Sequence, residues 1–205
     1  MLSDIIIQRI KNDLNAILYE NSLTIRIPIM KIISHPAPDE YFEYYGLYIK
    51  RVIDREDIFS LLNEQIEEIN QALGRLSDDQ ALFRDAPKEW SIKEVVGHIN
   101  DVERIFSYRI LCISRNDPTP LPGFEQDDYV REAGFDKYPI QDLLSEFEHL
   151  RRANILAIQN MDDALLLRKG TASGYPFSVR ALIHALAGHV DHHMASLREK
   201  YLPAV

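Results

Sequence analysis

The chain has 205 residues, 46% of them hydrophobic, so it is long enough to bury one sizeable core. Its net charge of −9 and isoelectric point near 5.2 argue against nucleic acid or an anionic membrane as the main partner. The single cysteine, Cys112, excludes an intrachain disulfide framework and fits a reducing cytoplasm. No apolar run approaches about 18 residues and no secretory leader is visible, so we expect a soluble, cytoplasmic protein.

Residues 1–29 are predicted to be an N-terminal extension of unknown role, ahead of a main domain over residues 30–205. Asp4–Tyr19 has the pattern of an amphipathic helix, and Leu23–Ile33 alternates as a strand does. Met30 precedes the segment that leads into the main domain. The extension is therefore either an appended arm or the product of an upstream start.

From about residue 55 to residue 200, the spacing of apolar residues predicts four helices. We expect these helices over Asp57–Leu76, from Ser91 toward Ser114, over about Ile140–Met161, and from Ser178 to about Tyr201. The second helix has a clear start, because Ser91 is a typical N-cap and Glu94 completes a capping box.

The connections between these helices differ in length and indicate the topology. Roughly 25 residues rich in turn formers, including Pro118, Pro122 and Gly123, separate the second helix from the third. A connection of that length suits a crossover rather than a tight antiparallel turn. Leu165–Tyr175 is predicted to form an irregular turn or a small hairpin. The sequence thus predicts an all-α four-helix bundle with one long crossover.

Two histidines four residues apart, His189 and His193, fall on one face of the fourth predicted helix. At about 100° per residue they share a narrow stripe with three leucines, whereas His184 lies opposite and His192 lies at its edge. Burying two polar rings in an apolar stripe is unfavourable unless a partner satisfies them. A divalent metal ion would satisfy both rings.

His98 is the best candidate for a third ligand, because it falls on the buried line of the second helix. His35 precedes the bundle, and His149 lies off the apolar stripe of the third helix. Three neutral imidazoles from two helices suit zinc, nickel or a similar ion, and leave coordination positions open. Open positions imply water or substrate, as in a catalytic site.

Two segments resemble motifs of the DinB/YfiT-like family. Trp90–Ile99, which contains His98, resembles the family's second-helix motif, and Ser178–His193 contains a match to its fourth-helix motif. The resemblance covers roughly residues 38 to 202 and leaves out residues 1–29. The two motifs are well separated and occur in the same order as in the family.

This resemblance implies an up-down-down-up four-helix bundle with a divalent metal on His98, His189 and His193. Homodimers are common in the family, so a homodimer is expected here. Characterised relatives include S-transferases that use low-molecular-weight thiols such as bacillithiol or mycothiol, and a thiol-dependent isomerase. The resemblance does not indicate which thiol or which small-molecule substrate is used.

We therefore expect a transferase in which the metal lowers the pKa of a small thiol, so that thiolate exists at neutral pH. The sequence offers no internal nucleophile, because Cys112 lies about 21 Å beyond His98 along a helix. A metal-dependent hydrolase is the alternative and needs a general base, for which Asp101 and Glu103 are poorly aimed. A non-catalytic, metal-stabilised binding bundle is the third possibility.

Four further side chains are candidates for supporting roles. Asp101, one turn after His98, is either an acceptor that orients an imidazole or a solvated surface acid. Arg109 and Arg151 are predicted to point into the bundle, where a guanidinium must be paired. Each is either paired with a glutamate of a neighbouring helix or anchors the carboxylate of a thiol cofactor. His192 is expected to support the site rather than to bind metal.

Overall fold

The computed structural model describes residues 31–205, and Ile32–Val205 form one compact unit. The predicted extension over residues 1–29, with its helix and most of its strand, lies outside the described residues. Residues 31–33, at the end of that predicted strand, have no regular secondary structure.

Four long helices make up the body of this unit. They are α3 (Ile58–Leu73), α4 (Ile92–Ser114), α6 (Ile140–Gln159) and α8 (Val179–Ser196). Each corresponds to a predicted helix, although α3 and α6 end two to three residues earlier than expected. A π-helical turn, Leu197–Tyr201, continues α8 to its predicted end.

Side-chain caps fix the starts of the two helices that carry the histidine motifs. The hydroxyl of Ser91 accepts the amide N–H of Glu94 at 3.0 Å, and the Glu94 carboxylate accepts the amide N–H of Ser91 at 2.8 Å. The predicted capping box is therefore formed. Ser178 caps α8 in the same way by accepting the amide N–H of Ala181 at 3.0 Å.

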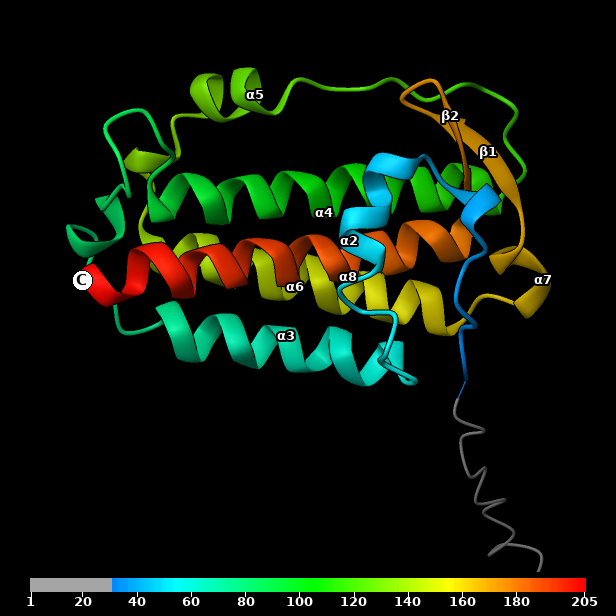
Figure 1. Ribbon diagram of the computed structural model, residues 1–205, viewed down its shortest axis with the longest axis horizontal. Helices are drawn as coiled ribbons and strands as arrows, with labels where there is room; N and C mark the ends of the chain where they lie inside the picture. Colours follow the sequence, from blue (N-terminus) through cyan, green and yellow to red (C-terminus); the bar gives the residue numbers. More distant parts are fainter. Residues whose placement is uncertain (1–30) are drawn as a thin grey trace, which may run out of the picture. The chain divides into compact units, whose positions relative to one another are not determined.

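The bundle has the predicted up-down-down-up topology. Helices α4 and α6 run in the same direction, opposite to α3 and α8 (Figure 1). Both α4 and α3 pack against α6 and α8, so α3 and α4 lie on opposite corners of the bundle. Because α4 and α6 are parallel, the chain must return along the length of the bundle between them, and residues 115–139 form this crossover.

Several short elements were not predicted from the sequence. They are α2 (Gly46–Ile49), α5 (Gln126–Ala133) within the crossover, and α7 (Asp163–Leu166) after α6. The hairpin alternative for the segment before α8 is confirmed. Its strands are β1 (Lys169–Ala172) and β2 (Tyr175–Ser178), paired antiparallel with Ala172 opposite Tyr175. The turn uses left-handed backbone at Ser173 and at Gly174, with φ of 53° and 82°.

The crossover is attached to the bundle at both of its ends. Near its start, the amide N–H of Leu121 donates to the Thr171 carbonyl at 2.9 Å, and that of Ser173 donates to the Leu121 carbonyl at 3.0 Å. Near its end, Phe135 packs directly on Gly97, where a Cβ atom would lie 2.3 Å from the ring. The crossover therefore covers α4 along the stretch that carries His98 (Figure 1).

Helix α8 is buried on nearly every side, since every residue from Ala181 to Val190 is buried. The buried surface of α8 is therefore wider than the narrow apolar stripe predicted from the sequence, because α8 packs against α2, α3, α4 and β2. His184, on the side opposite to His189, is consequently also buried. Among the described residues, no helix combines the length and the apolar character needed to span a membrane.

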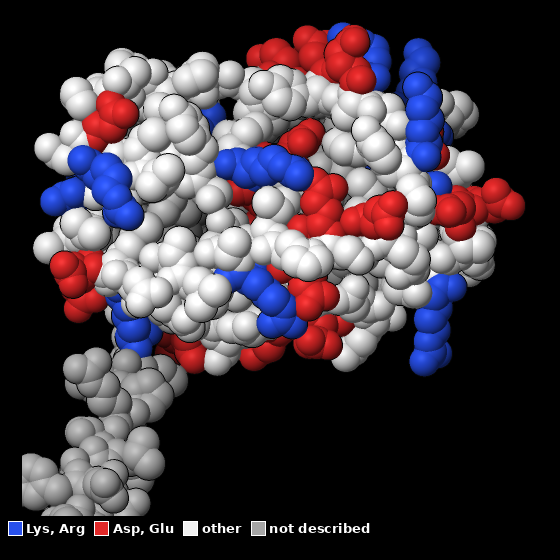
Figure 2. Space-filling view, turned by 180° about the vertical axis from the view of Figure 1, so that it is seen from behind, with Lys and Arg blue, Asp and Glu red and all other residues white. Residues whose placement is uncertain are grey.

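Charged side chains are spread over the molecular surface. On the face seen in Figure 2, acidic and basic groups alternate among uncharged ones, and no broad basic patch covers the described part of this face. Binding of a polyanion such as nucleic acid needs such a basic patch. The described part of this face does not offer one, in line with the net negative charge of the chain.

Candidate metal centre

The three predicted metal ligands come together in the middle of the bundle. The Nε2 atom of His189 lies 3.0 Å from Nε2 of His98 and 3.1 Å from Nε2 of His193. One ligand atom from each of the three rings lies within 4.8 Å of the others. The i, i+4 spacing on α8 and the cross-helix approach of α4 thus aim three imidazole nitrogens at one point.

Burial keeps these three rings neutral. His98 and His189 are 1% and 4% exposed, and burial lowers the pKa of His98 to about 4. Burial also holds the pKa of His189 and of His193 well below the ordinary value, and the neighbouring imidazoles lower both further. Each ring therefore carries one proton and one lone pair at neutral pH.

Hydrogen bonding among the rings does not satisfy this cluster. The lone pair of His189 cannot accept well from both neighbours, and Nδ1 of His98 is buried without any hydrogen-bond partner. Two nitrogens bound to one zinc-like ion at about 2.1 Å would lie about 3.0–3.4 Å apart. Two of the three nitrogen–nitrogen separations match the lower end of that range, and the third is no more than 4.8 Å, so a small adjustment of the rings would place all three on one divalent ion.

Two of the three histidines, His98 and His189, line a cavity of about 260 Å³. Its lining comes from α4, α8, the segment around α2 and the crossover. The lining residues are Tyr44, Tyr45, Tyr48, His98, Val102, Phe106, Phe124, Glu125, Gln126, Asp127 and His189. The candidate metal site is therefore open to a small molecule, as expected for a catalytic site rather than a closed structural one.

Three tyrosines in and just before α2 also line the histidine cavity. The ring of Tyr48 lies 5.3 Å from that of His189 and 5.4 Å from that of His192, and its hydroxyl is 3.3 Å from that of Tyr44. Burial, followed by the hydrogen bond with Tyr44, raises the pKa of Tyr48, so its phenol stays protonated. Tyr48 can therefore donate a proton or a hydrogen bond within the cavity.

Two carboxylates in the cavity wall, Glu125 and Asp127, were missed by sequence reasoning. They come from the crossover, where no helical or strand period assigns a side chain to a face. The useful signal was indirect: a long connection that returns along α4 must pass over the side chains of that helix. These carboxylates can accept a proton from a molecule bound beside the histidines.

Asp101 does not have the role of an imidazole acceptor. It is half-buried on α4, and the histidine nitrogen it was expected to engage, Nδ1 of His98, has no partner. Burial raises the pKa of Asp101, Arg104 lowers it and Glu146 raises it. Its charged neighbours are therefore Arg104 of α4 and Glu146 of α6.

Arg151 forms the internal ion pair that was one of its two predicted roles. It is fully buried and donates to Glu103, with a distance of 3.1 Å from Nε to the carboxylate. Its Nη1 atom donates to the side-chain carbonyl of Gln65 at 2.7 Å. Arg151 therefore does not line the histidine cavity, and Glu103, already engaged, is not available as a general base.

Arg109 has no glutamate partner among the described residues, so the internal ion pair, one of its two predicted roles, is not formed. Its Nη2 atom donates to the backbone carbonyl of Pro122 and to the hydroxyl of Ser173, both at 2.9 Å. It therefore joins the crossover to the hairpin and lies outside the histidine cavity.

His35, His149, His184 and Cys112 lie away from the cluster, whereas His192 borders it. His149 is exposed and bonds the carbonyl of Ser145 in its own helix. His35 stacks edge-on against His184, with ring centroids 5.3 Å apart. Exposed His192 stacks on His193 at 5.1 Å, and Cys112 is buried in the core, as predicted.

His184 is expected to make folding sensitive to mild acid. Burial lowers its pKa to about 4, while the Arg180 carbonyl that accepts from its Nδ1 raises it and nearby His35 lowers it. Because the unfolded chain binds this proton at a pKa of about 6.5, stability falls as the pH drops from about 6.5 to 4. Between pH 7 and pH 5 this residue should cost the metal-free parent about 2 kcal/mol.

Urea unfolding in EDTA at both pH values tests this expectation. A His184→Gln variant should lose about 2 kcal/mol less than the parent between pH 7 and pH 5. The exposed His149→Gln variant is the control and should follow the parent. Parallel pH profiles for parent and His184→Gln would contradict the assignment.

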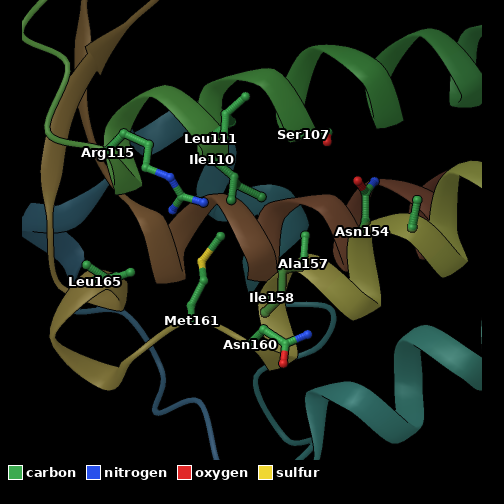
Figure 3. A pocket seen from close by; sticks show the side chains of 11 residues that line it. Ser107, Ile110, Leu111, Arg115, Asn154, Ala157, Ile158, Asn160, Met161 and Leu165 are labelled. Atoms are coloured by element: carbon green, nitrogen blue, oxygen red, sulfur yellow. The ribbon is translucent and has the colours of Figure 1, made fainter.

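A larger cavity, of about 450 Å³, lies between α4 and α6, away from the histidines. Figure 3 shows its mainly apolar wall, with Met161 and Ile158 on one side, Ile110 and Leu111 on the other, and Arg115 at the edge. Neither the three histidines nor any carboxylate lines it. Size alone therefore does not identify the candidate site.

Comparison with known proteins agrees with this architecture. The family model described as the DinB superfamily matches residues 61–197, a stretch that includes all three histidines. No curated protein matches the chain at a significant level.

Two solved structures are similar in fold. One is YfiT from Bacillus subtilis, described as a probable metal-dependent hydrolase with an unusual four-helix bundle topology. It has a TM-score of 0.64 and 14% identity, over 80% of this chain and 89% of that one. The other is a mycothiol-dependent maleylpyruvate isomerase, with a TM-score of 0.59 and 13% identity, over 73% of this chain and 61% of that one. At these identities the likeness establishes the fold alone.

Proposed function

Because the chain belongs to the DinB superfamily, we propose that His98, His189 and His193 bind a divalent metal ion and that the protein is a metal-dependent enzyme. The observation that carries this proposal is the approach of three neutral imidazoles, with Nε2 of His189 lying 3.0 and 3.1 Å from those of His98 and His193, beside an open cavity that His98 and His189 line. Zinc and nickel suit an all-imidazole donor set best.

The favoured reaction is transfer of a low-molecular-weight thiol, of the bacillithiol or mycothiol kind, to an electrophilic small molecule. A bound divalent ion would supply Lewis-acid chemistry that lowers the pKa of the thiol. The nucleophile must come from outside, since the single cysteine, Cys112, is buried in the core and does not line the cavity. The fold likeness to a mycothiol-dependent enzyme supports this choice.

The chain's own residues would position the reactants and move protons. Glu125 or Asp127 can take the thiol proton, because both line the cavity that the histidines share. Tyr48, protonated at neutral pH, can donate a hydrogen bond to the charge that develops on the substrate. Phe106 and Phe124 narrow the cavity and limit the access of water.

Metal-dependent hydrolysis is the second candidate. Asp101 and Glu103 are poorly aimed as bases, but two carboxylates that line the cavity, Glu125 and Asp127, could activate water. The neighbour described as a probable metal-dependent hydrolase supports this alternative. The two reactions differ in one requirement, since hydrolysis proceeds without any added thiol.

Metal content of untagged protein tests the site itself. The parent should carry about one equivalent of a divalent ion, measured by elemental analysis, and a His189→Ala/His193→Ala double variant should carry less than about a tenth of that. His149→Ala is the matched control and should bind as the parent does. A folded parent that takes up no zinc or nickel would overturn the proposal.

An activity panel then separates the reactions. Metal-loaded protein is assayed with several low-molecular-weight thiols and several electrophiles, and with ester and amide substrates in the absence of thiol. Thiol-dependent product that is lost in Asp127→Asn or Glu125→Gln supports transfer, whereas thiol-independent cleavage supports hydrolysis. Stable metal binding with neither activity would favour a non-catalytic, metal-stabilised binding bundle.

A further inference from the structure

A second, smaller chamber lies beside the histidine cavity under the same crossover. Its volume is about 220 Å³. The residues that line it include Arg104, Ile105, Tyr108, Arg109, Phe124 and Tyr129. Phe124 lines both spaces and so separates them. His98 and Arg109 are 11 positions apart on α4, or about 16 Å along its axis, so Arg109 itself lies well away from His98.

Arg109 is an unusual residue for such a chamber, because it is a buried cation without a counter-charge. It is 1% exposed, and none of the described carboxylates forms an ion pair with it. Its Nη2 atom bonds Pro122 and Ser173, but its Nη1 atom is buried with no hydrogen-bond partner. Arg151, the other fully buried arginine, has Glu103 and Gln65 as partners.

An unpaired buried guanidinium nitrogen is costly, and an anion that reaches it removes the cost. The other lining residues determine which kind of group can be attached to the anionic group of the ligand. Aromatic and aliphatic groups make up most of the wall, and the second arginine at the rim, Arg104, is already paired with Glu146. We propose that this chamber binds a small organic carboxylate with an aromatic or aliphatic body, whose carboxylate pairs with Arg109.

Entry of the ligand requires a local movement, because Nη1 of Arg109 is covered in this arrangement. The part of the crossover that covers the chamber, which contains Phe124 and Tyr129, can make this movement. Phe124 and Tyr129 stack edge-on at the chamber wall with ring centroids 5.2 Å apart, and Tyr129 is 49% exposed. The proposal goes beyond the metal-dependent function and does not rest on it, so binding is expected with and without metal.

Calorimetric titration of the full chain tests the chamber. Benzoate, phenylacetate and hexanoate are the carboxylate probes, and phenylacetamide is the uncharged match of phenylacetate. At least one carboxylate should bind to both EDTA-treated and metal-loaded protein, and phenylacetamide should bind at least tenfold more weakly than phenylacetate. Arg109→Gln should weaken carboxylate binding roughly tenfold to a hundredfold, because a charge-assisted pair is lost.

Two further variants keep the test decisive if Arg109→Gln does not fold. Ile105→Trp fills the chamber from a half-buried position and should abolish binding of every probe while the metal content stays at the parent value. Arg115→Gln, an exposed arginine beyond the end of α4, is the control and should bind as the parent does. No binding of any carboxylate, equal binding of the amide, or binding unchanged in Ile105→Trp would overturn the proposal.

Discussion

A Glu103→Ala variant is expected to lose about 3–5 kcal/mol of unfolding free energy, among the largest effects of any single substitution in this chain. Glu103 is 1% exposed and Arg151 is fully buried, so removing the carboxylate leaves a guanidinium charge in the core without a counter-ion. Breaking a buried pair from one side costs far more than the intact pair contributes.

The position of this pair in the bundle enlarges its effect. Glu103 lies on α4 and Arg151 on α6, and the amide of Asn154 also donates to Glu103 at 2.8 Å. Arg151 in turn holds Gln65 of α3, whose amide donates to the Ala187 carbonyl of α8 at 2.8 Å. One hydrogen-bonded chain thus joins all four long helices. It reaches α8 at Ala187, two residues before His189.

Urea denaturation of metal-free protein measures this effect. The matched control is the double variant Glu103→Leu/Arg151→Met, in which both charges are removed together and the volume is kept. It should be far closer to the parent than either single variant, because no charge is left unpaired. Single and double variants of equal stability would show that the pair is not the source of the loss.

A Gly188→Ala variant should give the second large effect, of about 1–3 kcal/mol or more. Glycine to alanine within a helix normally stabilises by up to about 1 kcal/mol, so the predicted sign is reversed here. The added Cβ would lie 2.0 Å from the backbone carbonyl oxygen of Tyr48, and no rotamer change can relieve a contact with backbone. Helix α2 must therefore move away from α8.

The consequence for the site can be measured separately from stability. Tyr48 stacks on His189 because the two backbones meet at Gly188, so the variant should alter the histidine cavity as well as the unfolding free energy. Gly46→Ala is the control, since its Cβ would meet only the Tyr41 ring at an ordinary 3.5 Å. If both variants unfold at the parent temperature, the close approach at Gly188 is not structurally required.

Periodicity and capping predicted the four long helices, because amphipathic segments carry a repeating signal. Ser91 with Glu94, and Ser178, are local signals, and the structure has both caps in place. The parallel direction of α4 and α6 followed from the length of the crossover. By contrast, α5 was not predicted. It has eight residues and only Val130 is buried, so it has no apolar face long enough to give a periodic signal.

The candidate site was predictable only where it lies on helices. His98, His189 and His193 share helical stripes, and the structure brings their Nε2 atoms together. For Asp101 and Arg109 the helical pattern left two roles open each, because direction around a helix says nothing about what the opposite surface offers. Glu125 and Asp127 come from a crossover whose side-chain directions are set by tertiary packing alone.

The up-down-down-up order also bears on how the chain reaches its native state. Helices adjacent in sequence do not form antiparallel hairpins: α3 and α4 lie at opposite corners, and α4 meets α6 only after residues 115–139. The main contacts of α8 are with α2, α3 and α4, far earlier in the chain. Its contact order is therefore high for a helical protein, and folding should be slower than that of a simple up-down bundle of similar length. The histidine cluster, which needs α4 and α8 together, can assemble only after the last long helix has docked.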